Sequence, residues 1–301
     1  MTGPTVTLAT PFGRVLTAMV TPFDADGELD TDGAARLAVE LIESGHDGLV
    51  LNGTTGESPT TSDAEKERLV RAVLEAVGDR AVILAGVGTN DTRHTVELAR
   101  QAEKAGAHGL LVVTPYYSKP PQAGLYAHFT TVADATGLPV LLYDIPARSG
   151  VPIATETLIR LAQHERIVAV KDAKDDLAAA SLVMAATDLA YYSGSDMFNL
   201  PLLSIGGVGF VSVVGHLVGA RLRELVDSYV AGEVTRAAAL HRDLLPVYEG
   251  IFRTQGVILT KAALALQGRP GGPVRLPLVD ATPAQIEALK TDLVAGGVPI
   301  A

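Results

Sequence analysis

Short apolar runs recur along the first 230 residues, and nearly every one is followed by a longer segment whose apolar positions have helical spacing. The runs are rich in Val, Ile and Leu, which is typical of strands buried on both faces. The pattern predicts eight strands, at residues 15–23, 48–52, 81–87, 109–114, 139–145, 167–171, 190–193 and 209–214.

The longer segments carry the start and stop residues of helices. Ser62 followed three residues later by Glu65 forms a capping box, and Gly45 ends the first helical segment. Helices are expected from residue 62 and at 31–44, 91–105, 121–136, 154–163, 177–187, 197–205 and 217–230.

Strands that alternate with helices predict parallel pairing with helices on the outer face. Eight strand–helix units of about 27 residues each match the unit size of a (β/α)8, or TIM, barrel. Three further helices are expected after the eighth unit and would form a C-terminal α-helical extension, at 233–252, 256–267 and 283–295. We therefore expect an α/β chain with a barrel that holds the site, residues 1–230, and a helical extension, residues 231–301.

A doubly wound open sheet is the alternative fold, because Gly86-Val87-Gly88 follows a predicted strand and precedes a helix. The third glycine of the dinucleotide-binding pattern is missing, since Asp91 stands in its place. The sequence therefore favours the barrel over a dinucleotide-binding open sheet, and it argues against a nicotinamide-dependent dehydrogenase.

Composition narrows the function classes. The net charge of −10 argues against nucleic acid or an anionic membrane as a partner. The chain has no cysteine, and its seven histidines include no pair at metal-ligand spacing, so we expect no disulfide and no metal site. No apolar run approaches the roughly 18 residues of a membrane span, and no signal peptide is evident. We expect a cytoplasmic protein.

Lys171 ends the sixth predicted strand, and a lysine in such a position is costly to bury. Alternation along this strand places Ile167, Ala169 and Lys171 on one face, so small Ala169 leaves room beside the ammonium group. Desolvation lowers the pKa of a buried lysine and makes it a nucleophile that forms a Schiff base with a carbonyl. Alternatively, Lys171 extends to water or pairs with Asp172 or Asp175.

Other strand ends carry further candidates, since the C-terminal ends of barrel strands hold the active site. Thr54 and Thr55 lie in a glycine-rich loop suited to a carboxylate or oxyanion, or they cap the next helix. Tyr143 shares a face with Leu141 and Ile145, and its phenol either enters the barrel mouth or belongs to the core. Arg148 either grips a carboxylate or forms a surface ion pair. The paired Tyr116-Tyr117 either packs locally or lies at an interface.

Taken together and in this order, three motifs resemble the dihydrodipicolinate synthase family, the pyruvate-dependent class I aldolases that include N-acetylneuraminate lyase. The motifs are Gly53-Thr54-Thr55-Gly56-Glu57, Tyr143-Asp144-Ile145-Pro146-Ala147-Arg148-Ser149-Gly150 and Val170-Lys171-Asp172. The resemblance covers nearly the whole chain. It implies that Lys171 forms a Schiff base with pyruvate and that no external cofactor or metal is needed.

The resemblance also implies roles for the remaining residues. Tyr143 would be the general acid/base, and Thr54 would link it to Tyr117, which in such enzymes reaches in from a neighbouring subunit. Thr55 would hold the pyruvate carboxylate, and the backbone carbonyl of Val211 would face the bound keto acid. The family therefore implies a homo-oligomer, expected here as a tetramer of two tight dimers.

Within this family, Arg148 and the Thr54-Thr55 pair resemble the synthase branch, in which that arginine binds the carboxylate of L-aspartate 4-semialdehyde. The implied reaction condenses pyruvate with the semialdehyde, a step towards diaminopimelate and lysine. The alternative is an aldolase that cleaves a sialic acid or a 2-keto-3-deoxy sugar acid. Asp144 departs from the pattern, because asparagine is common at that position.

Some family members are inhibited by lysine bound near the paired tyrosines. By the resemblance, Asn90 and Tyr116 retain groups that would hold the carboxylate of lysine. His94 stands where sensitive members have a glutamate, and Lys66 where histidine is common. A pocket with an added positive charge and without the acceptor carboxylate is expected to bind lysine weakly or not at all.

Overall fold

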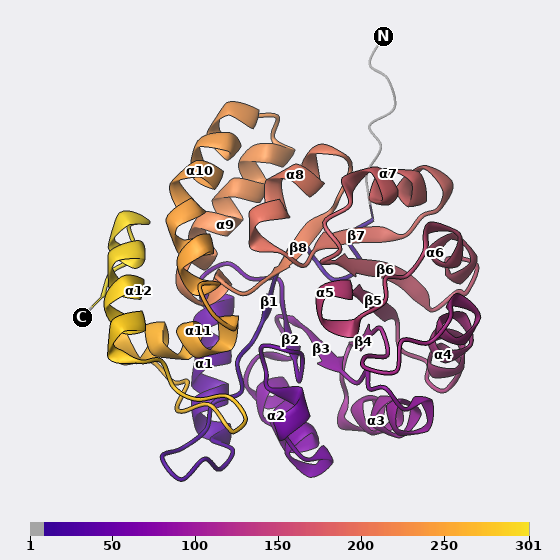
Figure 1. Ribbon diagram of the computed structural model, residues 1–301, viewed down its shortest axis with the longest axis horizontal. Coiled ribbons are helices and arrows are strands. Elements are labelled where there is room, and N and C mark those ends of the chain that lie inside the picture. Colours follow the sequence, from indigo (N-terminus) through magenta and orange to yellow (C-terminus); the bar gives the residue numbers. More distant parts are fainter. Residues whose placement is uncertain (1–8, 301) are drawn as a thin grey trace.

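The computed structural model describes residues 9–300, in which eight parallel strands close into a barrel in sequence order, β1 to β8. Figure 1 shows the strands at the centre, with helices α1 to α4 and α6 to α9 around them and the short α5 near the centre beside β5 and β6. The strands are β1 Val15–Ala18, β2 Gly48–Leu51, β3 Val82–Gly86, β4 Gly109–Val113, β5 Val140–Asp144, β6 Ile167–Asp172, β7 Ala190–Ser193 and β8 Gly209–Ser212. The expectation of a TIM barrel is confirmed.

Helices connect successive strands along the outer face. They are α1 Thr31–Glu43, α2 Asp63–Val77, α3 Thr92–Ala105, α4 Gln122–Asp134, α5 Pro146–Ser149, α6 Thr155–Leu161, α7 Leu177–Ala186, α8 Asn199–Ser204 and α9 Gly215–Val230, with short 3-10 turns η1 Ser58–Thr60 and η2 Asp196–Phe198. The predicted capping box starts α2, because Ser62 and Glu65 each bond the other's backbone N–H. Neither α5 nor η1 was predicted, since both are too short for a periodic pattern.

The first strand is shorter than predicted and ends at Ala18 rather than Phe23. Met19 still donates to the carbonyl oxygen of Val50 at 3.0 Å. The next backbone N–H, of Val20, is taken instead by Nε2 of buried His216 at 3.1 Å. A histidine side chain thus ends the ladder, which the local sequence of the strand does not encode.

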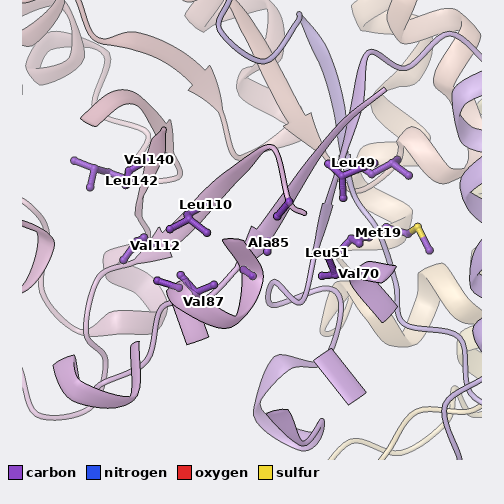
Figure 2. Close-up of a cluster of buried hydrophobic side chains, with 14 of the residues drawn as sticks. Met19, Leu49, Leu51, Val70, Ala85, Val87, Leu110, Val112, Val140 and Leu142 are labelled. Atoms are coloured by element: carbon purple, nitrogen blue, oxygen red, sulfur yellow. The ribbon is translucent and has the colours of Figure 1, made fainter. Parts of the chain in front are cut away.

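Alternation along the strands divides the core into two layers. One set of side chains fills the barrel interior, including Leu84, Leu111 and Leu141. The other set packs between the strands and the helices. Figure 2 shows part of this outer layer, with pairs on or directly after strands β2 to β5, namely Leu49 and Leu51, Ala85 and Val87, Leu110 and Val112, and Val140 and Leu142. The period of two in the sequence therefore sets which side chains can reach the barrel mouth.

The alternation predicted for β6 is wrong at its first residue. Val140 pairs with Ile167, but Leu141 pairs with Ala169, so Val168 is an extra residue in the ladder. This bulge places Ile167 in the outer layer, whereas Ala169 lies in the barrel interior. Beyond the bulge the pairing is regular, and Lys171 lies opposite Tyr143 as the register requires.

Three helices follow the barrel as expected, α10 Val234–Ile251, α11 Gly256–Leu266 and α12 Pro283–Ala295. In Figure 1 they lie beside α9 and α1 at the edge of the barrel. Leu244 of α10 and Leu289 of α12 share a hydrophobic cluster with Phe210 of β8 and Leu222 of α9. The outer ends of the two predicted units, residues 1–8 and 301, lie outside the described residues. No helix within the described part combines the length and apolar character that crossing a bilayer requires.

Candidate active site

A cavity of about 410 Å³ opens at the C-terminal ends of strands β2 to β5. Its lining includes four of the predicted site residues, Thr54, Tyr117, Tyr143 and Arg148. The volume lies in the range of small-molecule sites. The cavity is also at the end of the barrel where TIM-barrel enzymes carry their chemistry.

Lys171 lies next to Tyr143, one of the residues that line this cavity. The two residues are register partners on β6 and β5, and the Lys171 Nζ atom is 4.2 Å from the centroid of the Tyr143 ring. Both side chains are 4 % exposed. Gly194 gives the lysine its room, because a Cβ atom there would come within 3.1 Å of Lys171 Cε. The strand register therefore brings an amine and a phenol together.

The alternative interpretation of Lys171, extension to water or pairing with a neighbouring aspartate, does not match this geometry. Within residues 9–300, no carboxylate lies within 4.0 Å of its Nζ atom. Asp172 instead accepts hydrogen bonds from the backbone N–H groups of Lys174 and Asp175, at 2.9 and 3.0 Å. Asp175 accepts one from the hydroxyl of Ser195 at 3.1 Å.

Burial shifts both pKa values toward the neutral forms. It lowers the pKa of Lys171 to about 8, against an opposing effect of the Asp196 carboxylate. It raises the pKa of Tyr143 to about 12, with the Arg148 guanidinium and a side-chain hydrogen bond to Thr54 acting in the opposite direction. With a pKa near 8, about a quarter of Lys171 is free amine at pH 7.5, whereas an unperturbed lysine has only about one part in a thousand. The site therefore holds a usable nucleophile beside a protonated phenol.

Asp196 is a site residue that the sequence analysis missed. Its buried carboxylate accepts hydrogen bonds from the backbone N–H groups of Val213 and Val214, at 3.0 and 3.1 Å, and from the side chains of Ser212 and Asn199. These contacts fix a negative charge that favours a cation at Lys171. An acidic residue shortly after the predicted seventh strand was a usable sequence signal, because such residues lie at the active end of a barrel.

The other predicted residues divide into two groups. Thr54 lines the cavity, and so does Arg148, whose exposed side chain has no ion-pair partner among residues 9–300. Tyr117 also lines it, although its side chain is 89 % exposed and its φ is +73°. Thr55 and Val211 are buried and lie outside the set that lines the cavity. Among the described residues, no group of three or more His, Cys, Asp or Glu side chains is arranged to hold a metal ion.

The chain is similar to known proteins over nearly its whole length. The chain is 68% identical to 4-hydroxy-tetrahydrodipicolinate synthase 2 of Streptomyces coelicolor over 297 residues, which cover 99% of both chains. It is 70% identical to the 4-hydroxy-tetrahydrodipicolinate synthase of Acidothermus cellulolyticus, over 95% of this chain and 93% of that one. Among solved structures, DHDPS from Cyanidioschyzon merolae with lysine bound superposes with a TM-score of 0.95 at 41% identity, over 97% of this chain and 100% of that one.

The profile of the Dihydrodipicolinate synthetase family matches residues 11–295, which is nearly all of the chain. The match includes the barrel, the cavity and the three C-terminal helices. The chain therefore belongs to the dihydrodipicolinate synthetase family.

Proposed function

We infer that this chain is a lyase that condenses pyruvate with L-aspartate 4-semialdehyde, the reaction of 4-hydroxy-tetrahydrodipicolinate synthases. Relatives of that name match almost the full length at 68% and 70% identity, which supports this reaction over cleavage of a sialic acid or a 2-keto-3-deoxy sugar acid. The observation that carries the chemistry is the contact between the Lys171 amine and the Tyr143 ring, 4.2 Å apart in a buried site.

In the proposed reaction, the neutral amine of Lys171 attacks the keto carbon of pyruvate, and loss of water leaves an iminium ion. The Asp196 carboxylate, held by Ser212 of β8 and the two residues after it, favours that cation electrostatically. The iminium accepts the electron pair released when a methyl proton leaves, which gives an enamine. The enamine carbon then attacks the aldehyde of the second substrate. Finally, the amino group of that substrate closes on the imine carbon and displaces Lys171.

Proton transfers in this scheme go through Tyr143. Its raised pKa keeps the phenol protonated until a substrate anion is near, so it can donate to the leaving hydroxyl and the nascent alkoxide. Thr54 shares a side-chain hydrogen bond with Tyr143, and both residues line the cavity that Tyr117 also reaches. We propose that Thr54 and the Tyr117 of a neighbouring subunit connect Tyr143 to solvent.

Substrate binding is assigned by charge and position. Arg148 is an unpaired cation at the cavity wall, and we propose that it binds the carboxylate of the semialdehyde. Thr55 would hold the pyruvate carboxylate, and the Val211 carbonyl would face the keto acid from the barrel interior. Enzymes of this family act without a metal or an external cofactor. A cytoplasmic location belongs to the same proposal.

The assembly is part of the proposal as well. Tyr117 is 89 % exposed in a strained, left-handed backbone conformation, although the family resemblance implies a role for it in the site. A second subunit that covers this loop would bury the ring and bring it to the partner's cavity. We therefore propose a homo-oligomer, a tetramer built from two tight dimers.

The test is reductive trapping. Borohydride with pyruvate is expected to leave a stable adduct on Lys171, located by peptide mass mapping, and to abolish consumption of the semialdehyde. Lys174→Arg is the matched control, because Lys174 lies three residues on, its ammonium faces Asp144, and the adduct should form as in the unmodified chain. An adduct on another lysine, or full activity in Lys171→Ala, would show that the assignment is wrong.

A further inference from the structure

Glu57 ends the glycine-rich loop after β2, and its carboxylate is buried although no proposed chemical step uses it. The residue is 2 % exposed. Its backbone has φ of +53°, and Asn52 at the start of the loop has φ of +56°. Left-handed conformations are unfavourable for residues other than glycine and persist where surrounding contacts enforce them. The shape of the loop therefore depends on what holds its two ends.

The contacts that hold Glu57 come from the C-terminal extension. The Nζ atom of Lys261, on α11, lies 2.6 Å from Glu57 Oε1, and these two side chains are 3 % and 1 % exposed. The backbone N–H of Arg275, beyond α11, donates to Glu57 Oε2 at 2.8 Å. Both carboxylate oxygens are thus held by residues about 200 positions further along the chain.

The orientation of the Lys261 side chain is itself fixed by its contacts. Its ammonium donates to the carbonyl oxygen of Pro273 at 2.7 Å and lies 4.2 Å from the centroid of the Phe23 ring. The guanidinium of Arg275 lies over the same ring at 4.0 Å. A buried ammonium with a carboxylate, a carbonyl and an aromatic face around it has little freedom to move.

The loop passes this constraint on to Thr54 and Thr55 over a very short distance. The N–H of Glu57 donates to the carbonyl oxygen of Thr54 at 3.2 Å, and Thr21 donates its hydroxyl to the carbonyl oxygen of Gly56 at 2.6 Å. Moving the Glu57 carboxylate would therefore move the two threonines as well.

We propose that the buried Lys261–Glu57 pair is a positioning device, through which the C-terminal extension holds the Thr54–Thr55 loop in the shape that binds the carboxylate of the keto acid. The inference rests on the proposed function of Thr55. A buried ion pair is often no more stabilising than apolar side chains of the same volume, so stability alone does not account for it. Its value lies in the geometry that it imposes on the loop.

The test compares a double variant with a matched control. Lys261→Met/Glu57→Gln removes both buried charges at once and keeps the acceptor for the Arg275 N–H. Arg269→Met is the control, because Arg269 joins the extension to Glu40 on α1 at 2.7 Å, away from the loop. Both variants are examined for thermal unfolding, steady-state kinetics and the rate of pyruvate trapping on Lys171.

We expect KM for pyruvate to rise about tenfold or more in the double variant, because binding of the keto acid by Thr55 is weakened. The fall in kcat should be smaller than the rise in KM, because Thr54 shifts but Lys171 and Tyr143 keep their places on the strands. The KM for the semialdehyde should stay unchanged, and Arg269→Met should alter only the unfolding temperature. Lys261→Arg keeps the positive charge on a side chain of different shape and should give an intermediate KM for pyruvate. This variant provides the test if the double variant does not fold.

The positioning inference would be overturned if the folded double variant had an unchanged KM for pyruvate, whatever its unfolding temperature. If the double variant does not fold, an unchanged KM in Lys261→Arg would overturn it instead. Failure of the unmodified chain to trap pyruvate on Lys171 would instead overturn the proposed function. The two failures are therefore distinguishable.

Discussion

The site is built from two regions that are held in different ways. Lys171 and Tyr143 belong to the strands β6 and β5, where they are register partners and fully buried. Thr54 and Thr55 lie in a loop that begins and ends with left-handed residues and is tied to the C-terminal extension. The reacting amine and phenol thus stand on the barrel. Thr55, assigned to bind the keto acid, and Thr54, assigned to the proton path, stand on a loop that the barrel alone does not fix.

This difference separates chemistry from binding. A change in a strand residue should alter the chemical step and leave the loop in place, because the ladder around it stays intact. A change that frees the loop should alter affinity for the keto acid more than the rate at saturation. The predictions below test this separation, starting with the largest effect.

Tyr143→Phe is expected to lower kcat by about 10²- to 10⁴-fold, because the ring is kept and only the proton-transferring hydroxyl is removed. The Lys171 amine still lies against an aromatic face, so pyruvate trapping should survive at a reduced rate. Tyr192→Phe is the control, since Tyr192 lies on β7, on the other side of β6 from Tyr143. Its hydroxyl donates to the carbonyl oxygen of Gly13 at 2.9 Å and accepts from the N–H of Phe12 at 3.2 Å. This control should cost about 1 kcal/mol of stability and little activity. A kcat within about threefold of normal in Tyr143→Phe would contradict the acid/base assignment.

Arg148→Ala is expected to weaken use of the semialdehyde by about 2–4 kcal/mol in kcat/KM, because an unpaired cation at the cavity wall is lost. The rate of pyruvate trapping should fall far less than condensation does, since Lys171 and the loop keep their contacts and the Arg148 guanidinium is only a minor cause of the lowered pKa of Lys171. Arg160→Ala is the control, because Arg160 stacks on the Tyr126 ring at 4.2 Å and does not line the cavity. If trapping fell as far as condensation, Arg148 would serve pyruvate or the fold instead.

The same separation explains what the sequence could predict. Periods of two and of helical spacing placed all eight strands and put Lys171 and Tyr143 at strand ends, because these patterns act over a few residues. The bulge at Val168 was missed, since an extra residue in a ladder depends on the neighbouring strand. The contacts of Lys261 and Arg275 with Glu57 were missed as well, because they join parts of the chain about 200 residues apart. Asp196 was missed although its place after a strand was visible.

A third prediction concerns Asp144, which lies beside Tyr143 with its side chain outside the barrel mouth. Its carboxylate accepts from the N–H of Ile153 at 3.1 Å, and the Lys174 ammonium lies 3.4 Å away. Burial raises the pKa of Asp144 to about 6, against the opposing effect of Lys174. A folded-state pKa above the ordinary value of about 3.9 means that the folded chain binds the proton more tightly than the unfolded chain.

The sign of the effect follows from this order of pKa values. The stabilisation is fully present below about pH 4 and is lost as the pH rises through about 6, a change of about 2–3 kcal/mol. Asp144→Asn has no such proton, so its free energy of unfolding relative to the unmodified chain should increase by that amount from pH 4 to pH 7. Urea unfolding at several pH values measures the difference. Asp243→Asn, exposed on α10, should follow the unmodified chain in parallel, and a parallel curve for Asp144→Asn would refute the assignment.

The last prediction concerns inhibition by lysine near the loop side of the cavity. Lysine is expected to have little or no effect on activity. The Nε2 atom of His94 is not free to accept a hydrogen bond from the ammonium of lysine, because it lies 3.0 Å from Asp63 Oδ2. The Lys66 ammonium donates to the carbonyl oxygens of Ser58 and Thr61, at 2.9 and 2.5 Å, and stays as a positive charge next to the cavity wall that Ser58 forms.

Lysine carries two ammonium groups, so the fixed cation at this wall should repel it. The nearby Asp63 carboxylate is already paired with His94. A charge-assisted contact is worth about 1.5–3 kcal/mol, and its loss alone lowers affinity roughly ten- to hundredfold. We therefore expect initial rates to change little across a lysine titration. His94→Glu, which restores an acceptor on α3, should increase sensitivity to lysine, while Arg93→Glu on the exposed side of the same helix should not. Half-inhibition of the unmodified chain well below about 1 mM, a binding free energy of about 4 kcal/mol, would show that this wall attracts lysine after all.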